Sequence, residues 1–184
     1  MAFFVAATSR GGEAVLELQS TDGKRHKFFS EDGGEAAKAV VLIFTATDCP
    51  VANYFQPTIR RLEETFASQG VRFFQVYPDR DTTVEAAKKH AEDYGIQTPQ
   101  VLDPKQKIAD QAEAMKTPEA VVYTADGKKI YLGRIDDTYA SLGKKRPNPK
   151  THDLHEAIGR ALSGAATELV ETEAVGCFIF FEDD

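Results

Sequence analysis

The 184-residue chain contains no apolar run close to the roughly 18 residues of a membrane-spanning helix, so no span is expected. Two cysteines are too few for a disulfide-dense scaffold, and 13 glycines and 8 prolines are too ordinary for a fibrous or disordered chain. An excess of positive charge is also missing, because 22 Lys and Arg stand against 29 Asp and Glu, for a net charge of −7. Surfaces that bind nucleic acid or anionic membranes need clustered positive charge, so neither partner is expected.

The N-terminal residues 1–7, MAFFVAA, lack the basic segment and the apolar length of a secretory signal peptide. They fit a first strand, a frayed end, or the point at which a signal has been removed. Two cysteines do not fix the redox compartment either. The localisation therefore stays open: periplasmic or secreted if a signal was removed, and cytoplasmic otherwise.

Hydrophobic patterning predicts an alternation of strands and helices. A continuous apolar run at residues 39–45 predicts a strand buried on both faces of a sheet, and residues 71–77 predict another strand. Residues 13–29 predict a hairpin that turns at Asp22-Gly23. Apolar residues at helical spacing predict four helices, which contain Phe55–Phe66, Val84–Tyr94, Ile108–Met115 and Leu154–Leu162. The remaining predicted segments are an extended stretch at 99–103, strands at 120–124 and 129–134, and a polar loop at 136–150. This order predicts a single α/β domain over residues 1–184, with a C-terminal tail from about residue 165.

Cys49 is the strongest candidate for chemistry. It lies between a predicted buried strand and a helix whose first residue is Pro50, and proline suits that position because its missing N–H has no partner there. Free backbone N–H groups and the positive helix end stabilise a thiolate, so the pKa of a thiol there falls from about 8.5 by about one to several units. The neighbouring Asp48 carboxylate acts in the opposite direction. The alternative is a buried structural cysteine, as most free cysteines are.

The run Asp48-Cys49-Pro50-Val51-Ala52-Asn53 after a buried strand resembles the thioredoxin-like redoxin superfamily, with its AhpC/TSA-type redoxin domains and bacterial thiol–disulfide oxidoreductases. Pro57 lies eight residues after the cysteine, where that fold carries a proline that kinks the helix. Thr117-Pro118 precedes a predicted strand and resembles the loop whose cis-proline faces the cysteine.

The resemblance covers about Val15 to Ile179 and implies a thioredoxin-like fold. This fold has a central mixed β-sheet flanked by helices, here with an N-terminal hairpin and an extra helix and strand within residues 79–116. It also implies that Cys49 is a nucleophilic thiolate, and that Thr117 and Pro118 present backbone polar groups to an extended substrate.

Two departures from these families bear on activity. Thioredoxins use Cys-x-x-Cys, but Ala52 occupies the position of the second cysteine. Peroxiredoxins carry Thr or Ser three residues before the cysteine and Pro seven before it, where this chain has Ala46 and Leu42. Thr45, four residues before the cysteine, would substitute only if the loop were shifted. Neither parent chemistry is therefore intact.

Cys177 on the tail is the candidate for the missing second thiol. It can resolve a mixed disulfide or a sulfenic acid if the tail folds back over the Cys49 loop, and Gly176 would allow a close backbone approach. Two alternatives stay open. The cysteine packs into the apolar tail end, or it forms a permanent structural disulfide with Cys49.

The remaining polar residues carry weaker signals. His90 is expected on the polar side of its helix, and His152 and His155 on the polar face of theirs, because two histidines without a third ligand are poor evidence of a metal site. No Gly-rich phosphate loop follows a strand and no His or Cys spacing fits a metal, so no cofactor or metal is implied.

Two charged or apolar segments have alternative interpretations. Arg134 and Asp136-Asp137 either line a cysteine cleft or hold the 136–150 loop through ion pairs, and we favour the ion pairs. The apolar segment 178–181 is either an exposed docking strand or a last edge strand protected by the acidic residues after it, and we favour the edge strand.

Three functions follow from these observations. The first is thiol–disulfide exchange with protein thiols or disulfides and a thiol reductant, with Cys49 as nucleophile and Cys177 as resolving thiol. The second is a peroxiredoxin-like thiol peroxidase that consumes peroxide. The third is a non-catalytic binding module of the same fold with a structural disulfide, since fold alone does not decide function.

Overall fold

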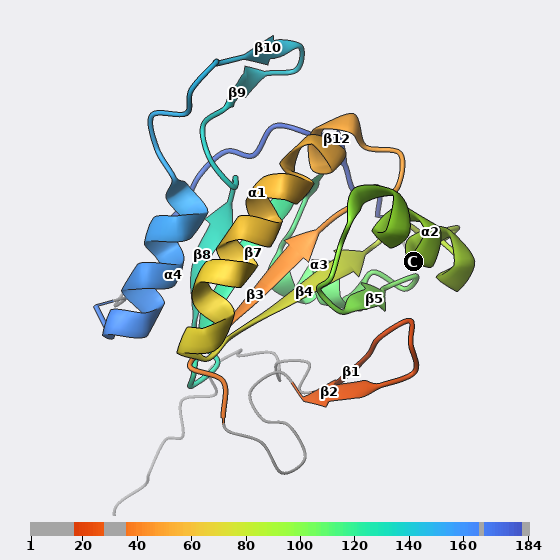
Figure 1. Ribbon diagram of the computed structural model, residues 1–184, viewed down its shortest axis with the longest axis horizontal. Coiled ribbons are helices and arrows are strands. Elements are labelled where there is room, and N and C mark those ends of the chain that lie inside the picture. Colours follow the sequence, from red (N-terminus) through yellow and green to blue (C-terminus); the bar gives the residue numbers. More distant parts are fainter. Residues whose placement is uncertain (1–16, 28–35, 166–167, 182–184) are drawn as a thin grey trace, which may run out of the picture.

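The computed structural model describes residues 17–27, 36–165 and 168–181, so the expectation for residues 1–7 lies outside the described part (Figure 1). A central sheet has the strand order β11-β8-β7-β3-β4-β5. In chain order its strands are β3 (Ala39–Phe44), β4 (Val71–Tyr77), β5 (Gln100–Leu102), β7 (Glu119–Thr124), β8 (Lys129–Gly133) and β11 (Val170–Glu171). β3, β4 and β5 run parallel, whereas β7 is antiparallel to both β3 and β8. The sheet is therefore mixed, as expected.

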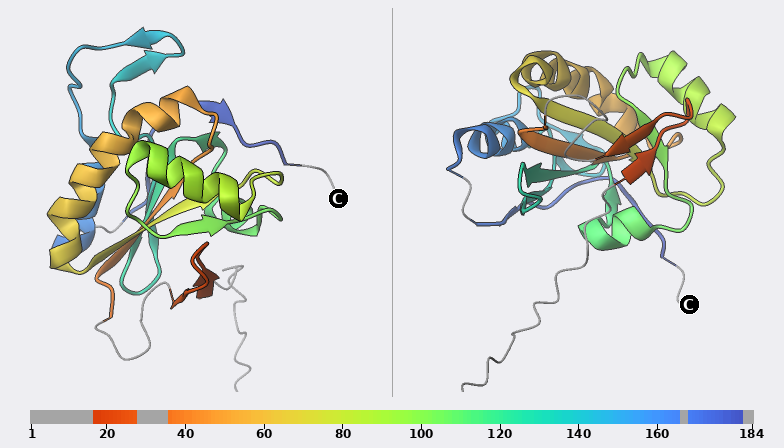
Figure 2. Two further views of the ribbon diagram at one scale, coloured as in Figure 1. Left: turned by 45° about the vertical axis from the view of Figure 1, so that its right-hand side comes forward. Right: turned by 90° about the horizontal axis from the view of Figure 1, so that it is seen from below.

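Helices cover both faces of this sheet. α1 (Pro50–Phe66), α2 (Val84–Tyr94) and α4 (Asp153–Ser163) lie on one face, and α3 (Lys107–Ala112) lies on the other (Figure 2). The 3-10 helix η1 (Ala67–Gln69) extends α1 to Gly70. The prediction of four helices is confirmed, except that α3 ends at Ala112, before Met115. None of the helices in the described ranges is long and apolar enough to cross a membrane.

Small two-stranded sheets complete the described part of the chain. They pair β1 (Glu17–Gln19) with β2 (Arg25–Lys27), β9 (Tyr139–Ser141) with β10 (Lys144–Lys145), and β6 (Lys116–Thr117) with β12 (Cys177–Phe178). The first pair is the predicted hairpin, whose outer residues 13–16 and 28–29 lie outside the described residues. The second pair corrects the prediction of a loop over 136–150. There the Lys145 ammonium lies 3.8 Å from the centroid of the Tyr54 ring, an attraction that holds the β9–β10 hairpin against α1.

β3 explains why its sequence is a continuous apolar run. Every residue of the strand is buried, and alternate side chains point to opposite faces of the sheet. Val41 and Ile43 pack in the cluster formed with α1 and α4, while Leu42 and Phe44 pack in the cluster formed with α3. Burial of each such side chain contributes about 1.5–3 kcal/mol relative to exposure.

The same core fixes the direction of α1. Its buried residues recur at helical spacing and face the sheet; they are Val51, Ala52, Phe55, Gln56, Ile59, Leu62 and Phe66. Pro50 occupies the first turn, and Cys49 is the N-cap residue with extended backbone angles of φ −81° and ψ 107°. Pro57 lies inside α1, as the resemblance implied, and its side chain is exposed. The sequence thus forces the chain to turn from β3 into α1 at Cys49.

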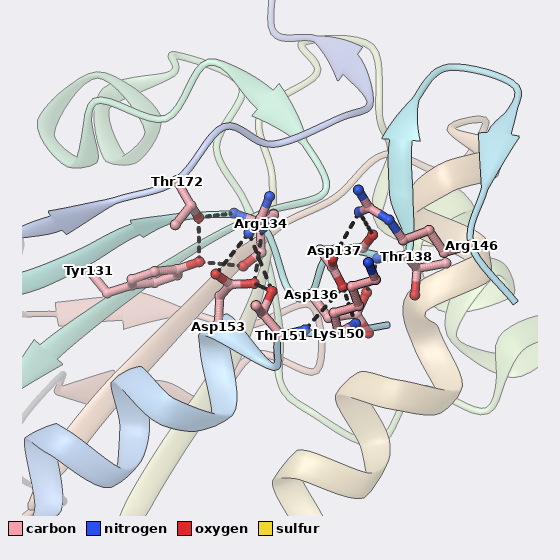
Figure 3. Close-up of polar contacts among 10 residues, drawn as sticks. All are labelled: Tyr131, Arg134, Asp136, Asp137, Thr138, Arg146, Lys150, Thr151, Asp153 and Thr172. Atoms are coloured by element: carbon pink, nitrogen blue, oxygen red, sulfur yellow. Dashed lines mark hydrogen bonds and ion pairs between the residues drawn. The ribbon is translucent and has the colours of Figure 1, made fainter. Parts of the chain in front are cut away.

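An ion-pair network holds the segment between β8 and α4 (Figure 3). The Arg134 guanidinium donates two hydrogen bonds to the Asp153 carboxylate, at 2.9 and 3.1 Å, and Arg146 donates one to Asp137 at 2.8 Å. Asp137 also accepts hydrogen bonds from the backbone of residues 150 and 151. These contacts confirm the favoured interpretation, in which the charged residues hold the loop.

Replacing Arg134 with methionine is expected to lower the free energy of unfolding by about 1–2 kcal/mol, because it leaves the half-buried Asp153 carboxylate without its two-pronged partner. Burial raises the pKa of Asp153, but hydrogen bonds from Arg134 and Thr151 outweigh it and hold the pKa below its ordinary value. The contribution is therefore full above pH 4 or so and is lost as the pH falls through the lower folded pKa. Urea melts of both proteins between pH 3 and 7 measure this difference.

The exposed pair of Lys89 and Asp93 on α2 supplies the control. Lys89→Met removes an ion pair of similar length but is expected to change the free energy of unfolding much less, because solvent screens the exposed pair. Equal losses in the two variants would show that the Arg134 pair has no special structural weight.

Candidate functional site

Cys49 lies in the interior, at the junction of β3 and α1. Its side chain has 0% exposure, and its thiol donates a hydrogen bond to the backbone carbonyl of Thr117 at 2.9 Å. The Asn53 N–H donates to the Cys49 carbonyl at 3.0 Å, which closes the first turn of α1. The predicted strand-to-helix position is confirmed, whereas its complete burial was not expected.

The loop that faces Cys49 contains β6 and the peptide bond between Thr117 and Pro118, which is cis. The cis geometry expected from the resemblance is therefore confirmed. The buried Glu119 carboxylate fixes the loop, because it accepts hydrogen bonds from the N–H groups of Met115 at 2.7 Å and Lys116 at 3.2 Å. The loop thus presents the Thr117 carbonyl to the cysteine from a rigid support.

The C-terminal tail covers the same loop. β12 pairs antiparallel with β6, so that Cys177 lies opposite Thr117 and Phe178 opposite Lys116. Gly176 makes this approach feasible, because a Cβ atom added there would overlap the Thr117 carbonyl oxygen. The tail thus folds back over the Cys49 loop, which was the condition for Cys177 to act on Cys49.

The edge-strand prediction for residues 178–181 needs correction. β12 contains only Cys177 and Phe178, and its partner is β6 rather than the central sheet. The edge of the central sheet is instead β11, which pairs parallel with β8. Phe180 beyond β12 is 82% exposed. Residues 178–181 therefore do not extend the central sheet.

Two side chains fasten the tail on either side of Cys177. The Lys116 ammonium donates a hydrogen bond to the Ala174 carbonyl at 2.8 Å and lies 5.5 Å from the centroid of the Phe178 ring. The buried Gln106 amide donates to the Phe180 carbonyl at 2.8 Å and to that of Pro78 at 3.1 Å. The Ile179 N–H donates to the Met115 carbonyl at 2.9 Å. These bonds hold the tail cysteine in place.

The two thiols influence each other directly. Burial raises the pKa of Cys49. The Cys177 thiol, the Thr117 side chain and the Ala52 N–H can donate hydrogen bonds to its thiolate form, and their effect outweighs burial and holds the pKa below its ordinary value. Burial and the hydrogen bond to Cys49 raise the pKa of the Cys177 thiol to about 11. Both cysteines are free thiols, Cys49 buried and Cys177 exposed. Cys49 is therefore the more acidic thiol of the pair.

Thr117→Val is expected to raise the pKa of Cys49, measured by thiolate absorbance near 240 nm in a Cys177→Ser background. The Thr117 hydroxyl is buried and has no hydrogen-bond partner among the described residues while Cys49 is protonated, so it is available to donate to the thiolate. A hydrogen bond to the charged form of an acid favours ionisation.

Thr45→Val is the matched control for this measurement. Its hydroxyl is equally buried and also lacks a partner among the described residues, but it does not contribute to the pKa of Cys49. We expect no change in that variant. If the pKa of Cys49 rose in Thr45→Val and stayed the same in Thr117→Val, the stabilising hydroxyl would be that of Thr45, and the prediction would be wrong.

A pocket of about 360 Å³ opens beside Cys177. Its lining includes Thr117, the exposed ring of Phe178 and residues of the loop after β4. Aspartates 48, 79 and 81 together with Arg80 make the wall rich in acidic groups. The tail cysteine thus faces solvent through a small, acidic hollow.

A polar network that the sequence did not indicate supports the first turn of α1. His90 is buried, with its ring nitrogens 2.9 Å from the Tyr77 hydroxyl and 2.8 Å from the Asn53 side-chain oxygen. Asn53 donates to the Thr47 carbonyl at 3.2 Å. The expectation that His90 lies on a polar surface is wrong, because this side of α2 packs against Tyr77 and α1.

The structure brings together all four predicted site residues, Cys49, Thr117, Pro118 and Cys177. It adds Lys116, Gln106 and Glu119, which position the loop and the tail without touching the sulfur of Cys49. In the sequence these three are isolated polar residues, and only the neighbourhood of Lys116 and Glu119 to Thr117-Pro118 offered a signal. No group of three or more potential metal ligands occurs within the described residues.

The comparison with known proteins agrees with this geometry. A family model described as AhpC/TSA family matches residues 12–132. No functionally curated protein matches the chain. An uncharacterized conserved protein from Geobacillus kaustophilus is similar at a TM-score of 0.77 and 23% identity, over 97% of this chain and 95% of its own. A hypothetical protein from Sinorhizobium meliloti 1021 gives a TM-score of 0.75 at 21% identity, with 94% of each chain covered.

A more distant similarity is to a secreted disulfide oxidoreductase from Mycobacterium tuberculosis, with a TM-score of 0.53 at 18% identity, over 80% of this chain and 94% of that one. At these identities the solved structures establish the thioredoxin-like fold. Cys177 lies beyond the segment that the family model matches. Because that segment spans well over half of the sequence and includes both Cys49 and the cis-proline loop, the chain belongs to the AhpC/TSA family.

Proposed function

We propose that this protein is a thiol–disulfide oxidoreductase whose redox couple is Cys49 and Cys177. The observation that carries the proposal is the position of Thr117. Its carbonyl accepts a hydrogen bond from the Cys49 thiol, and its backbone lies opposite Cys177 in the β6–β12 pair. One residue of the cis-proline loop therefore lies against both cysteines. The influence of each thiol on the pKa of the other supports the same pairing.

The chemistry balances as a two-electron exchange with protein thiols and disulfides. The oxidised pair contains one sulfur–sulfur bond, and an external dithiol reduces it through a mixed disulfide and leaves with a disulfide of its own. The reduced pair carries the two electrons to a client disulfide by the reverse sequence. Cys49 supplies the thiolate, since its pKa is held below the ordinary value.

A peroxidase is less well supported by the site. Peroxide must reach the attacking sulfur, but Cys49 has 0% exposure with the tail in place. Ala46 and Leu42 stand where peroxiredoxins have Thr or Ser and Pro. Peroxide consumption is therefore expected to be slow relative to disulfide exchange.

Redox titration followed by peptide mapping tests the proposal. After equilibration with oxidised and reduced dithiothreitol, we expect a Cys49–Cys177 peptide that appears and disappears reversibly over a single two-electron transition. Reduction of a disulfide-linked peptide should follow at catalytic protein concentrations, faster than hydrogen peroxide is consumed under the same conditions. Two cysteines that never join would overturn the proposal, and a bond that resists reductant until the protein unfolds would make it a structural disulfide.

A further inference from the structure

We infer that external thiols enter the redox couple at Cys177, and that Cys49 departs from the disulfide as the leaving thiolate. This inference rests on the proposed Cys49–Cys177 couple and specifies which of its two sulfurs meets the partner. It differs from the sequence expectation, in which Cys49 meets the substrate first.

Accessibility is the first argument. Cys49 has 0% exposure, whereas Cys177 is exposed. Thiol–disulfide exchange requires the attacking sulfur to reach one sulfur of the target bond, so access decides which one is attacked. A partner reaches Cys49 only after β12 leaves β6, but it reaches Cys177 with the tail in place.

The second argument is that the tail is firmly held. The hydrogen bond from Lys116 to Ala174 precedes the cysteine, and those from Gln106 to Phe180 and from Ile179 to Met115 follow it. Further back, Thr172 fastens the tail to β8, because its hydroxyl lies 2.6 Å from that of Tyr131 and its N–H donates to the Leu132 carbonyl (Figure 3). Displacing β12 would break several of these bonds together, whereas attack at Cys177 breaks none of them.

The third argument is the pocket of about 360 Å³ beside Cys177. Asp48, Asp79 and Asp81 line it with one arginine, so its wall favours positive charge. After burial and Cys49, the charge of the Asp48 carboxylate also raises the pKa of the Cys177 thiol. The exposed rings of Phe178 and Phe180 add apolar surface at the pocket. The partner that fits is a protein cysteine with basic and apolar neighbours.

The exchange is balanced in atoms and electrons. The partner thiolate attacks the sulfur of Cys177, a bond forms between those two sulfurs, and the bond to Cys49 breaks with its electron pair on Cys49. A second thiolate of the partner then attacks the first partner sulfur and releases Cys177, which takes up a proton. The partner leaves as a disulfide, and the couple is reduced by two electrons.

The acidities of the two thiols agree with this direction. A thiol of lower pKa leaves faster, and the pKa of Cys49 is held below its ordinary value by its hydrogen bonds. Cys177, with a pKa of about 11, would be the poorer leaving group if a partner attacked Cys49 instead.

The test is a trapping experiment on the oxidised full-length protein. Peptide mapping first verifies the Cys49–Cys177 disulfide, which separates failure of the proposed function from failure of the present assignment. Limiting glutathione is then added, the reaction is quenched in acid within its first half-life, and free thiols are alkylated. We expect glutathione on the Cys177 peptide at least ten times more often than on the Cys49 peptide. Glutathione mainly on Cys49 would overturn the assignment, and absence of the starting disulfide would remove the proposed function and this assignment with it.

A charge series tests the pocket as the entrance. At low salt the cationic thiol cysteamine is expected to reduce the disulfide at least about five times faster than anionic 2-mercaptoethanesulfonate, after correction for thiolate fraction. The ratio should fall in high salt and in Asp48→Asn. Asp126→Asn, in the turn between β7 and β8, is the remote control and should keep the wild-type ratio. Equal rates for the two thiols in the wild type would overturn entry through this pocket.

Discussion

Replacing either Cys49 or Cys177 with alanine is expected to lower the rate of thiol–disulfide turnover by at least about 1000-fold at millimolar external thiol. With both cysteines beside Thr117, the second step of exchange is intramolecular, and well-oriented intramolecular groups act at effective concentrations far above molar. In either single variant that step needs a second external thiol. The loss is measured as the steady-state rate at which a disulfide-linked peptide is reduced, after subtraction of the rate without the protein.

The double variant is the control for this prediction. If the two cysteines act as one unit, Cys49→Ala combined with Cys177→Ala is no slower than either single variant, because each removes the same couple. Multiplying losses would show two independent thiols. Wild-type turnover in Cys177→Ala would contradict the couple altogether.

Gly176→Ala is expected to slow formation of the Cys49–Cys177 disulfide by about 100-fold, a loss typical of a misplacement of about 1 Å in a reacting group. The added Cβ would overlap the Thr117 carbonyl oxygen, so β12 must move away from β6. The central sheet does not depend on that contact, and the variant should still fold. Rapid-quench peptide mapping after addition of oxidised dithiothreitol measures the rate.

Gly159→Ala is the matched control, because it makes the same chemical change in α4 where a Cβ meets no atom within 4 Å. It should leave the disulfide rate unchanged and stabilise the protein by about 0.5–1 kcal/mol, since glycine is a poor residue inside a helix. Wild-type disulfide formation in Gly176→Ala would mean that close approach of the tail is not required.

The core of the fold was predictable because its signals are local. The apolar run of β3 and the helical spacing of α1 are both contained in short windows of sequence, and together they place Cys49 at their junction. The cis geometry before Pro118 was different in kind: no local pattern required it, and it came from the resemblance to a family. Family resemblance thus supplied what spacing alone did not.

The tail shows where sequence reasoning ended. Gly176 indicated a close approach, and the structure has one, but the partner strand β6 contains only Lys116 and Thr117. Two residues carry no detectable strand pattern, and the pairing joins positions far apart in the chain. The hydrogen bonds from Lys116 and Gln106 to the tail are contacts of single side chains, and the hydrophobic periodicity of the sequence does not indicate them. Hence the pairing of Cys177 with the loop was expected, but not its burial of Cys49.

His90 gives the opposite lesson about polar residues. Its place among charged neighbours on α2 suggested a surface position, yet the Tyr77 hydroxyl and the Asn53 amide satisfy both ring nitrogens in the interior. Burial lowers the pKa of His90, so the ring stays neutral and fits between them. The buried position of His90 depends on partners from β4 and α1, and the sequence of α2 alone does not reveal them.

The β6–β12 pair also sets the order in which the protein becomes competent during its synthesis. Cys49 leaves the ribosome well before Cys177, since 128 residues separate the two cysteines. At about 5–20 residues per second this interval lasts roughly 6–26 seconds, during which the nascent chain holds a thiol without its partner. Translation of the tail therefore supplies both the second cysteine and the strand that covers the first, so a chain halted before Gly176 contains Cys49 without either of them.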